Sequence, residues 1–112
     1  MNNNLNKTKI YDNGKYIGEI KNDIREGKGI MHWNDGVRYE GEWKNDIPEG
    51  KGIYYYKSGN RYEGDMKNGL KEGKGIFYYS NGDREMGDYF KSNHIGKHVR
   101  LTKDGEVNIN NY

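Results

Sequence analysis

Carboxylates, lysines and two histidines are the residues of this chain that could carry out chemistry. Carboxylates recur at regular positions, such as Glu42 and Asp65, whereas catalytic acids are singular and lie in a cleft. The triplet Gly50-Lys51-Gly52 lacks the other residues of a phosphate-binding loop. The chain shows no sequence motif of a Ser-His-Asp catalytic triad and no zinc-binding motif. The sequence therefore predicts no catalytic residue, no cofactor and no enzyme activity.

His94 and His98 are four residues apart, with Lys97 and Arg100 beside them. Two imidazoles at this spacing bind a metal when they share a helix face or when further ligands join them, and neighbouring cations oppose binding. We therefore expect no metal site, and we interpret both histidines as capping or solvent-exposed residues.

The composition excludes several functional classes. The chain has 112 residues, with 19 Lys and Arg against 17 Asp and Glu, a net charge of +2. This balance predicts no nucleic-acid partner. No cysteine is present, which excludes disulfides and thiolate metal sites. The start, from Met1 to Lys9, lacks the apolar core of a signal peptide, and no apolar run is long enough to span a bilayer. We expect a cytoplasmic protein.

A repeat of 23 residues organises the chain. Its first block recurs with decay at the end: Tyr16-Ile17-Gly18-Glu19-Ile20, Tyr39-Glu40-Gly41-Glu42-Trp43, Tyr62-Glu63-Gly64-Asp65-Met66 and Glu85-Met86-Gly87-Asp88-Tyr89. Its second block keeps the same spacing: Gly27-Lys28-Gly29-Ile30, Gly50-Lys51-Gly52-Ile53, Gly73-Lys74-Gly75-Ile76 and Gly96-Lys97-His98-Val99. A turn glycine also recurs, at Gly36, Gly59, Gly82 and Gly105. Several columns in one period indicate a repeat protein.

Each repeat predicts one β-hairpin. Side chains alternate between faces in a strand, so Tyr39, Gly41 and Trp43 share one face. Asn45-Asp46 tolerates the positive φ of a chain reversal, and we interpret Pro48 as part of this turn rather than of a central strand. The glycine columns lie on the aromatic face, where a missing side chain leaves space for a ring. Successive hairpins then join into an all-β, elongated, single-layer antiparallel meander.

The repeat boundaries predict the domain organisation. We expect a flexible segment at 1–8 and a repeat domain at 9–105, followed by a tail at 106–112. The units are a half unit at 9–15, units at 16–38, 39–61 and 62–84, and a degenerate capping unit at 85–107. In this last unit His98, Arg100 and Thr102 replace glycine and aromatic residues, as a polar cap requires. The tail adds a last strand or pairs with another chain.

The repeat resembles the MORN repeat (membrane occupation and recognition nexus). The resemblance rests on the pattern Tyr-Glu-Gly-Glu-Trp, turn, Gly-Lys-Gly, aromatic residues and Asp-Gly, and it covers roughly residues 9 to 105. Units 39–61 and 62–84 are near-complete, 16–38 is good and 85–107 is degenerate. The resemblance implies a curved β-sheet without catalytic residues. It also implies scaffolding, dimerisation or contact with membrane components, as in junctophilins, some phosphatidylinositol-phosphate kinases, a lysine methyltransferase and cytoskeletal proteins.

We expect a protein partner, with a homodimer as an alternative, and two surfaces are candidates for binding it. The first is an exposed stripe on the charged face, formed by Ile53, Tyr55, Ile76 and Tyr78. Tyrosine is enriched at protein interfaces. The second is the aromatic face, which we interpret as mainly structural but which could receive a peptide or helix. Its candidates are Tyr39, Trp43, Tyr54, Tyr56, Tyr62, Phe77 and Tyr79.

Two further functions remain open. A lysine row could bind phospholipid headgroups at a membrane surface, through Lys28, Lys51, Lys74 and Lys97. The adjacent acidic row offsets its potential within a Debye length of about 8 Å, so we expect these charges to pair across the sheet. The run Tyr54-Tyr55-Tyr56 before Ser58-Gly59 is similar to aromatic repeats that bind carbohydrate or choline. The 23-residue period argues against that assignment.

Overall fold

The structure is a computed structural model that describes residues 7–112. Ten antiparallel strands follow one another in chain order and form one open sheet. The strands are β1 (Lys7–Tyr11), β2 (Gly14–Lys21), β3 (Ile24–Trp33), β4 (Arg38–Lys44), β5 (Ile47–Tyr55), β6 (Arg61–Lys67), β7 (Leu70–Tyr78), β8 (Arg84–Phe90), β9 (Asn93–Leu101) and β10 (Val107–Asn111). The predicted all-β meander is confirmed. Within residues 7–112, no helix is long and apolar enough to cross a membrane.

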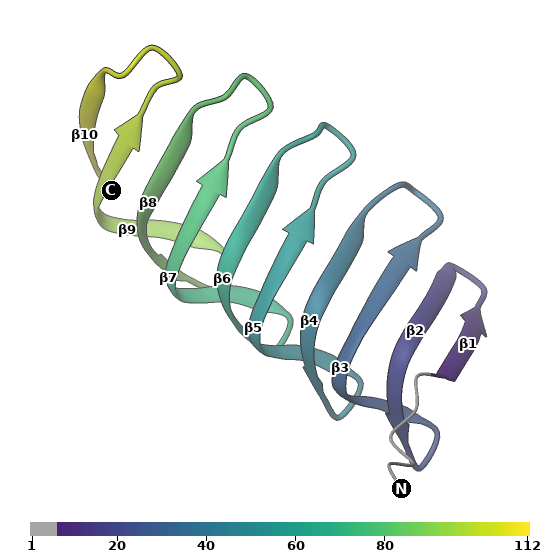
Figure 1. Ribbon diagram of the computed structural model, residues 1–112. Helices are drawn as coiled ribbons and strands as arrows, with labels where there is room; N and C mark the ends of the chain where they lie inside the picture. Colours follow the sequence, from purple (N-terminus) through teal and green to yellow (C-terminus); the bar gives the residue numbers. More distant parts are fainter. Residues whose placement is uncertain (1–6) are drawn as a thin grey trace, which may run out of the picture.

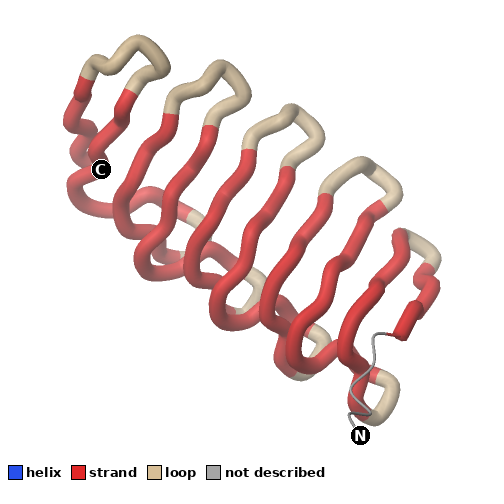
Figure 2. The backbone as a smooth tube through the Cα atoms, viewed as in Figure 1, coloured by secondary structure: helices blue, strands red, loops and turns tan. Residues whose placement is uncertain are grey.

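The hairpins are lined up one behind the next, so the molecule is elongated (Figure 1). Its principal extents are 48 × 29 × 23 Å. The strands curve, and the turns lie along two opposite edges of the sheet (Figure 2). We call the face that carries Tyr16, Tyr39 and Tyr62 the inner face, and the opposite one the outer face.

The two edges use different turns. At one edge, two residues with positive φ connect the strands, as at Asn45 (φ 50°) and Asp46 (φ 71°). This is the geometry of the type I′ turn that Asn-Asp favours. At the other edge, longer turns contain the recurrent glycine, such as Gly59 with φ 94°. The interpretation of Pro48 was wrong, because it is the second residue of β5 and pairs with Trp43. Its position next to the turn makes the missing N–H tolerable.

Tyrosine rings packed on glycines form the core. In three units the ring of Tyr16, Tyr39 or Tyr62 lies over the second glycine of Gly-Lys-Gly, and a Cβ on that glycine would collide with the ring. The hydroxyl of Tyr16 donates to the carbonyl of Glu19 at 2.8 Å, and the other two tyrosines repeat this bond. Burial raises the pKa of Tyr16 to about 12, so the phenol stays neutral and its hydrogen bond persists at physiological pH. The glycine columns are therefore space for rings, as predicted.

A β-bulge beside the first glycine column explains the curvature. The pairing register shifts between Gly18 and Ile20 in β2, and at the equivalent positions of β4, β6 and β8. A bulge bends its strand and increases the local twist. Because it recurs in every unit, the whole sheet bends along one line.

One further strand lies at each end of the repeat array, β1 at the start and β10 at the end. Lys7 and Thr8 belong to β1, so they are not part of a separate segment, and the remaining residues of the expected flexible segment lie outside the described ones. The tail forms β10, which pairs with β9. The backbone N–H of Tyr112 donates to the carbonyl of Gly96 at 2.9 Å. The tail thus adds the last strand of this sheet.

Candidate interaction surface

The inner face is filled by its own aromatic side chains. Tyr39, Tyr62 and Trp43 have exposed fractions of 0%, 0% and 3%. The prediction that these three residues bind a partner was wrong, because side chains without exposed surface belong to the core and cannot contact a partner. A half-buried layer covers them and consists of Trp33, Tyr54, Tyr56, Phe77 and Tyr79. Its rings touch in series, with centroids 5.4 Å apart for Tyr54 and Tyr56 and 4.9 Å apart for Phe77 and Tyr79.

The outer face carries a long open groove of about 1040 Å³. Backbone of the glycine columns forms its floor, at Gly18, Gly29, Gly41, Gly52, Gly64, Gly75 and Gly87. One wall is mostly apolar, with Ile17, Ile30, Ile53, Ile76 and Met86, and the other carries charges, with Lys28, Glu42, Lys51, Lys74, Asp88 and Lys97. Side chains at the glycine positions would point to the inner face, so the groove lies between the two outer-facing rows of side chains and has strand backbone as its floor.

The predicted stripe lies on this outer face. Ile53 faces Glu40 and Glu63 on the neighbouring strands, so isoleucines alternate with glutamates in the centre of the wall. Ile53, Ile76, Tyr55 and Tyr78 are half-buried rather than fully exposed. The guanidinium of Arg38 stacks on Tyr55 and that of Arg61 stacks on Tyr78, each 3.8 Å from the ring centroid. The stripe is thus an ordered row of isoleucines beside Arg–Tyr stacks.

The four lysines of the row, Lys28, Lys51, Lys74 and Lys97, are exposed along the groove. The Lys51 ammonium lies 2.5 Å from Asp65, and that of Lys74 lies 3.7 Å from Asp88. Glu42 instead accepts a hydrogen bond from the backbone N–H of Lys51 at 2.8 Å. The expected pairing across the sheet is therefore confirmed for Lys51 and Lys74, while neither Lys28 nor Lys97 forms an ion pair within residues 7–112.

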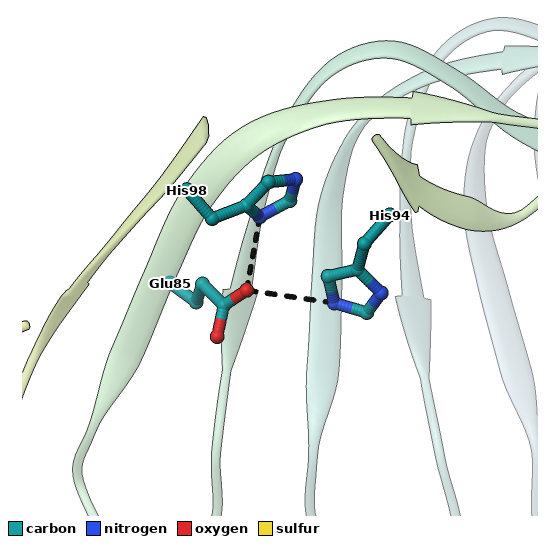
Figure 3. A group of neighbouring side chains, drawn as sticks. All are labelled: Glu85, His94 and His98. Carbon is teal, nitrogen blue, oxygen red and sulfur yellow. Dashed lines mark ion pairs between the residues drawn. The ribbon is translucent and has the colours of Figure 1, made fainter. Parts of the chain in front are cut away.

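A buried polar cluster occupies the inner face of the last unit. Glu85, His94 and His98 point toward one another under the curved strands β8 and β9 (Figure 3). Glu85 Oε2 lies 2.9 Å from Nδ1 of His98 and 3.6 Å from Nε2 of His94. The exposed fractions of Glu85 and His98 are 1% and 0%. The expectation of a solvent-exposed His98 is therefore wrong, and His94 is half-buried, with a pKa lowered by that burial.

Sequence reasoning missed this cluster although a signal was present. Glu85 stands in the column of Tyr16, Tyr39 and Tyr62, and His98 stands in the column of Gly29, Gly52 and Gly75. In the last unit, a glutamate replaces the tyrosine of one column, and a histidine replaces the glycine of the facing column. Glu85, His94 and His98 are also the group within residues 7–112 whose ligand atoms, all within 4.8 Å of one another, could hold a metal ion.

Comparison with known proteins gives one family. The model of the MORN repeat matches three consecutive segments, residues 16–38, 39–61 and 62–84. These segments cover more than half of the chain. No curated protein matches it by sequence.

Proposed function

This chain belongs to the MORN-repeat family, and on that premise we propose that it is a scaffold that binds a polypeptide segment of a partner protein in the outer groove. The family is generally a non-catalytic repeat module, consistent with protein or membrane interaction. A groove with one apolar and one charged wall supports the protein-binding alternative. That groove is the single observation on which the proposal depends.

The dimensions and chemistry of the groove define the partner segment. The lining residues run from β2 to β9, which is roughly 34 Å at a strand spacing of about 4.8 Å. An extended segment of about 10 residues has this length. Its apolar side chains would face Ile30, Ile53 and Ile76, and its charged side chains would face the alternating lysines and carboxylates. Backbone of such a segment can approach the glycine floor closely because no side chain intervenes.

Partner capture with matched variants tests the proposal. Ile53→Ser combined with Ile76→Ser removes apolar surface from the groove wall without touching the inner core. The control, Ile47→Ser combined with Leu70→Ser, removes two exposed apolar residues (39% and 41% exposed) beside the hairpin turns. Burial of an aliphatic side chain is worth about 1.5–3 kcal/mol, so the groove variant should bind the captured partner at least ~10-fold more weakly. The control should bind it like the wild type. Equal binding by all three proteins would remove the groove from consideration.

A membrane surface is the alternative partner, supported by the four exposed lysines along one wall. The aspartates that pair with Lys51 and Lys74 weaken this alternative, since they reduce the local positive potential. Flotation with vesicles that contain or lack anionic lipid separates the two functions. Binding that requires anionic lipid, and that Lys51→Gln with Lys74→Gln abolishes, would favour the membrane.

A further inference from the structure

The last unit keeps the packing of the repeat with different residues. The ring of His98 lies over Gly87, where a Cβ would collide with it. Nε2 of His98 lies 2.8 Å from the carbonyl of Asp88. In the first unit, Tyr16 makes the corresponding bond to Glu19 of its own strand, whereas His98 reaches Asp88 from the neighbouring strand. One ring nitrogen of His98 therefore fulfils the structural task of the tyrosine hydroxyl.

The bond to Asp88 uses Nε2 of His98, so Nδ1 is available for another interaction. A carbonyl only accepts, so Nε2 carries a proton, and in a neutral imidazole Nδ1 is then an acceptor. Nδ1 is fully buried and has no hydrogen-bond partner in the described part of the chain, although Glu85 Oε2 is 2.9 Å away. At so short a distance, the carboxylate oxygen must lie off the direction of a ring N–H. A carboxylate oxygen and a ring nitrogen this close in a buried site require a positive charge, which a proton on Nδ1 or a bound cation supplies.

His94 completes a three-ligand arrangement. Its Nε2 is 3.6 Å from Glu85 Oε2, and the three ligand atoms lie within 4.8 Å of one another. Two ligands of a tetrahedral zinc ion, each about 2.0–2.1 Å from the metal, are separated by roughly 3.3 Å. The two distances from the carboxylate oxygen, 2.9 and 3.6 Å, lie on either side of this value.

Hydrogen bonds around the cluster orient its ligands. The hydroxyl of Tyr112 donates to Glu85 Oε2 at 3.0 Å, and that of Tyr79 donates to Glu85 Oε1 at 3.3 Å. Together with the bond from His98 to Asp88, they provide the outer contacts that fix metal ligands in proteins.

The two cations beside the histidines in the sequence, Arg100 and Lys97, do not point into the cluster. The guanidinium of Arg100 pairs with Asp83 at 2.9 Å and stacks on the ring of Tyr79. Lys97 is exposed and lines the groove on the outer face. A third cation, Lys71 on the inner face, was not considered in the sequence; it lies among aromatic rings 5.4–5.7 Å from its ammonium, and its charge adds to the effect of burial in lowering the pKa of His94. The missing further ligand is Glu85, which the fold supplies from β8.

We infer that Glu85, His94 and His98 form a zinc-binding site that fastens β8 to β9 at the end of the sheet. Two imidazoles and one carboxylate suit Zn²⁺ rather than Mg²⁺ or Ca²⁺, which prefer oxygen ligands throughout. Three protein ligands leave the fourth tetrahedral position to water. The site acts on the terminal unit and is independent of the partner-binding groove on the other face.

The test uses the full chain without an affinity tag, stripped with a chelator and titrated with Zn²⁺ in a calorimeter. We expect one zinc ion per chain, a higher Tm after loading, and the visible absorption bands of tetrahedral Co²⁺ when cobalt replaces zinc. Glu85→Gln and His94→Gln should each weaken binding by more than about 100-fold, the upper end of what loss of an outer partner costs. His32→Gln alters an exposed histidine on the outer face and should leave binding unchanged.

Two results would overturn the site. Failure of the stripped wild type to bind zinc would show that Glu85 and His98 form an ion pair only. Equal binding by the wild type and Glu85→Gln, with both folded by circular dichroism, would place the metal elsewhere. His94 is half-buried and Glu85→Gln preserves side-chain shape, so loss of folding does not confound both variants.

Discussion

At the scale of single residues, the repeat depends on a tyrosine on one strand and a glycine on the next. Tyr39 fills the space above Gly52, and its hydroxyl donates to the carbonyl of Glu42 at 3.0 Å. In the last unit, the smaller Glu85 replaces the tyrosine and the larger His98 replaces the glycine, and both side chains are buried. The ring of His98 then makes the buried bond to the carbonyl of Asp88. The two columns are therefore one coupled position.

This coupling predicts a non-additive pair of substitutions. Glu85→Tyr places a second ring in the space that His98 occupies over Gly87, and overpacking of this kind costs about 1–3 kcal/mol. His98→Gly in the same chain restores the Tyr–Gly pair and should recover at least about 1 kcal/mol of that loss. Urea unfolding of the wild type, the two single variants and the double variant gives the coupling free energy. Additive effects would contradict the coupled position.

At the scale of the hairpin, turn chemistry determines how well each unit closes. The two-residue turns place Asn22, Asn45 and Asn68 at φ of 50–52°, which asparagine tolerates. The last of these turns places Lys91 in the same column with φ 47°. A lysine has no local hydrogen bond to offset this conformation. The terminal unit therefore has the least favourable turn residue of the four.

Lys91→Asn should stabilise the protein by about 0.5–1 kcal/mol, because asparagine adopts positive φ at lower cost. Thermal unfolding measures the change. The matched control is Lys67→Asn, which alters an exposed lysine at the end of β6 where φ is not positive. Stabilisation by both substitutions alike would point to a charge effect instead of turn geometry.

The hairpins also show what the sequence can and cannot reveal. Asn45-Asp46 and Gly59 identify turns because their conformational preference is local. Pro48 was misplaced because the end of a strand depends on pairing with Trp43, which the residues alone do not specify. The outer groove was not foreseen, since the sequence identifies its isoleucine and lysine rows but not the space between them. His98 was interpreted as a capping or solvent-exposed residue because its column was considered without the facing column of Glu85.

At the scale of the whole molecule, each unit is stabilised by its neighbours. The indole N–H of Trp43 donates to the carbonyl of Gly29 at 3.1 Å, and Arg25 pairs with Asp46 of the next unit at 2.7 Å. Such nearest-neighbour contacts hold repeats in register. The outer groove is continuous because units 16–38, 39–61 and 62–84 repeat the same glycine floor and isoleucine wall, and Met86 and Gly87 extend them into the last unit. The proposed partner binding in this groove would therefore be a property of the array rather than of one hairpin.

Site-specific photo-crosslinking to the captured partner tests this claim most directly. p-Benzoylphenylalanine is introduced in place of Ile53 or Ile76 in the groove, and in place of Tyr56 on the inner face as the control. All three positions are half-buried in the wild type, so differences in yield report the face rather than exposure. We predict adducts from positions 53 and 76 and none from position 56. Adducts from position 56 alone would contradict the account and place the partner on the inner face.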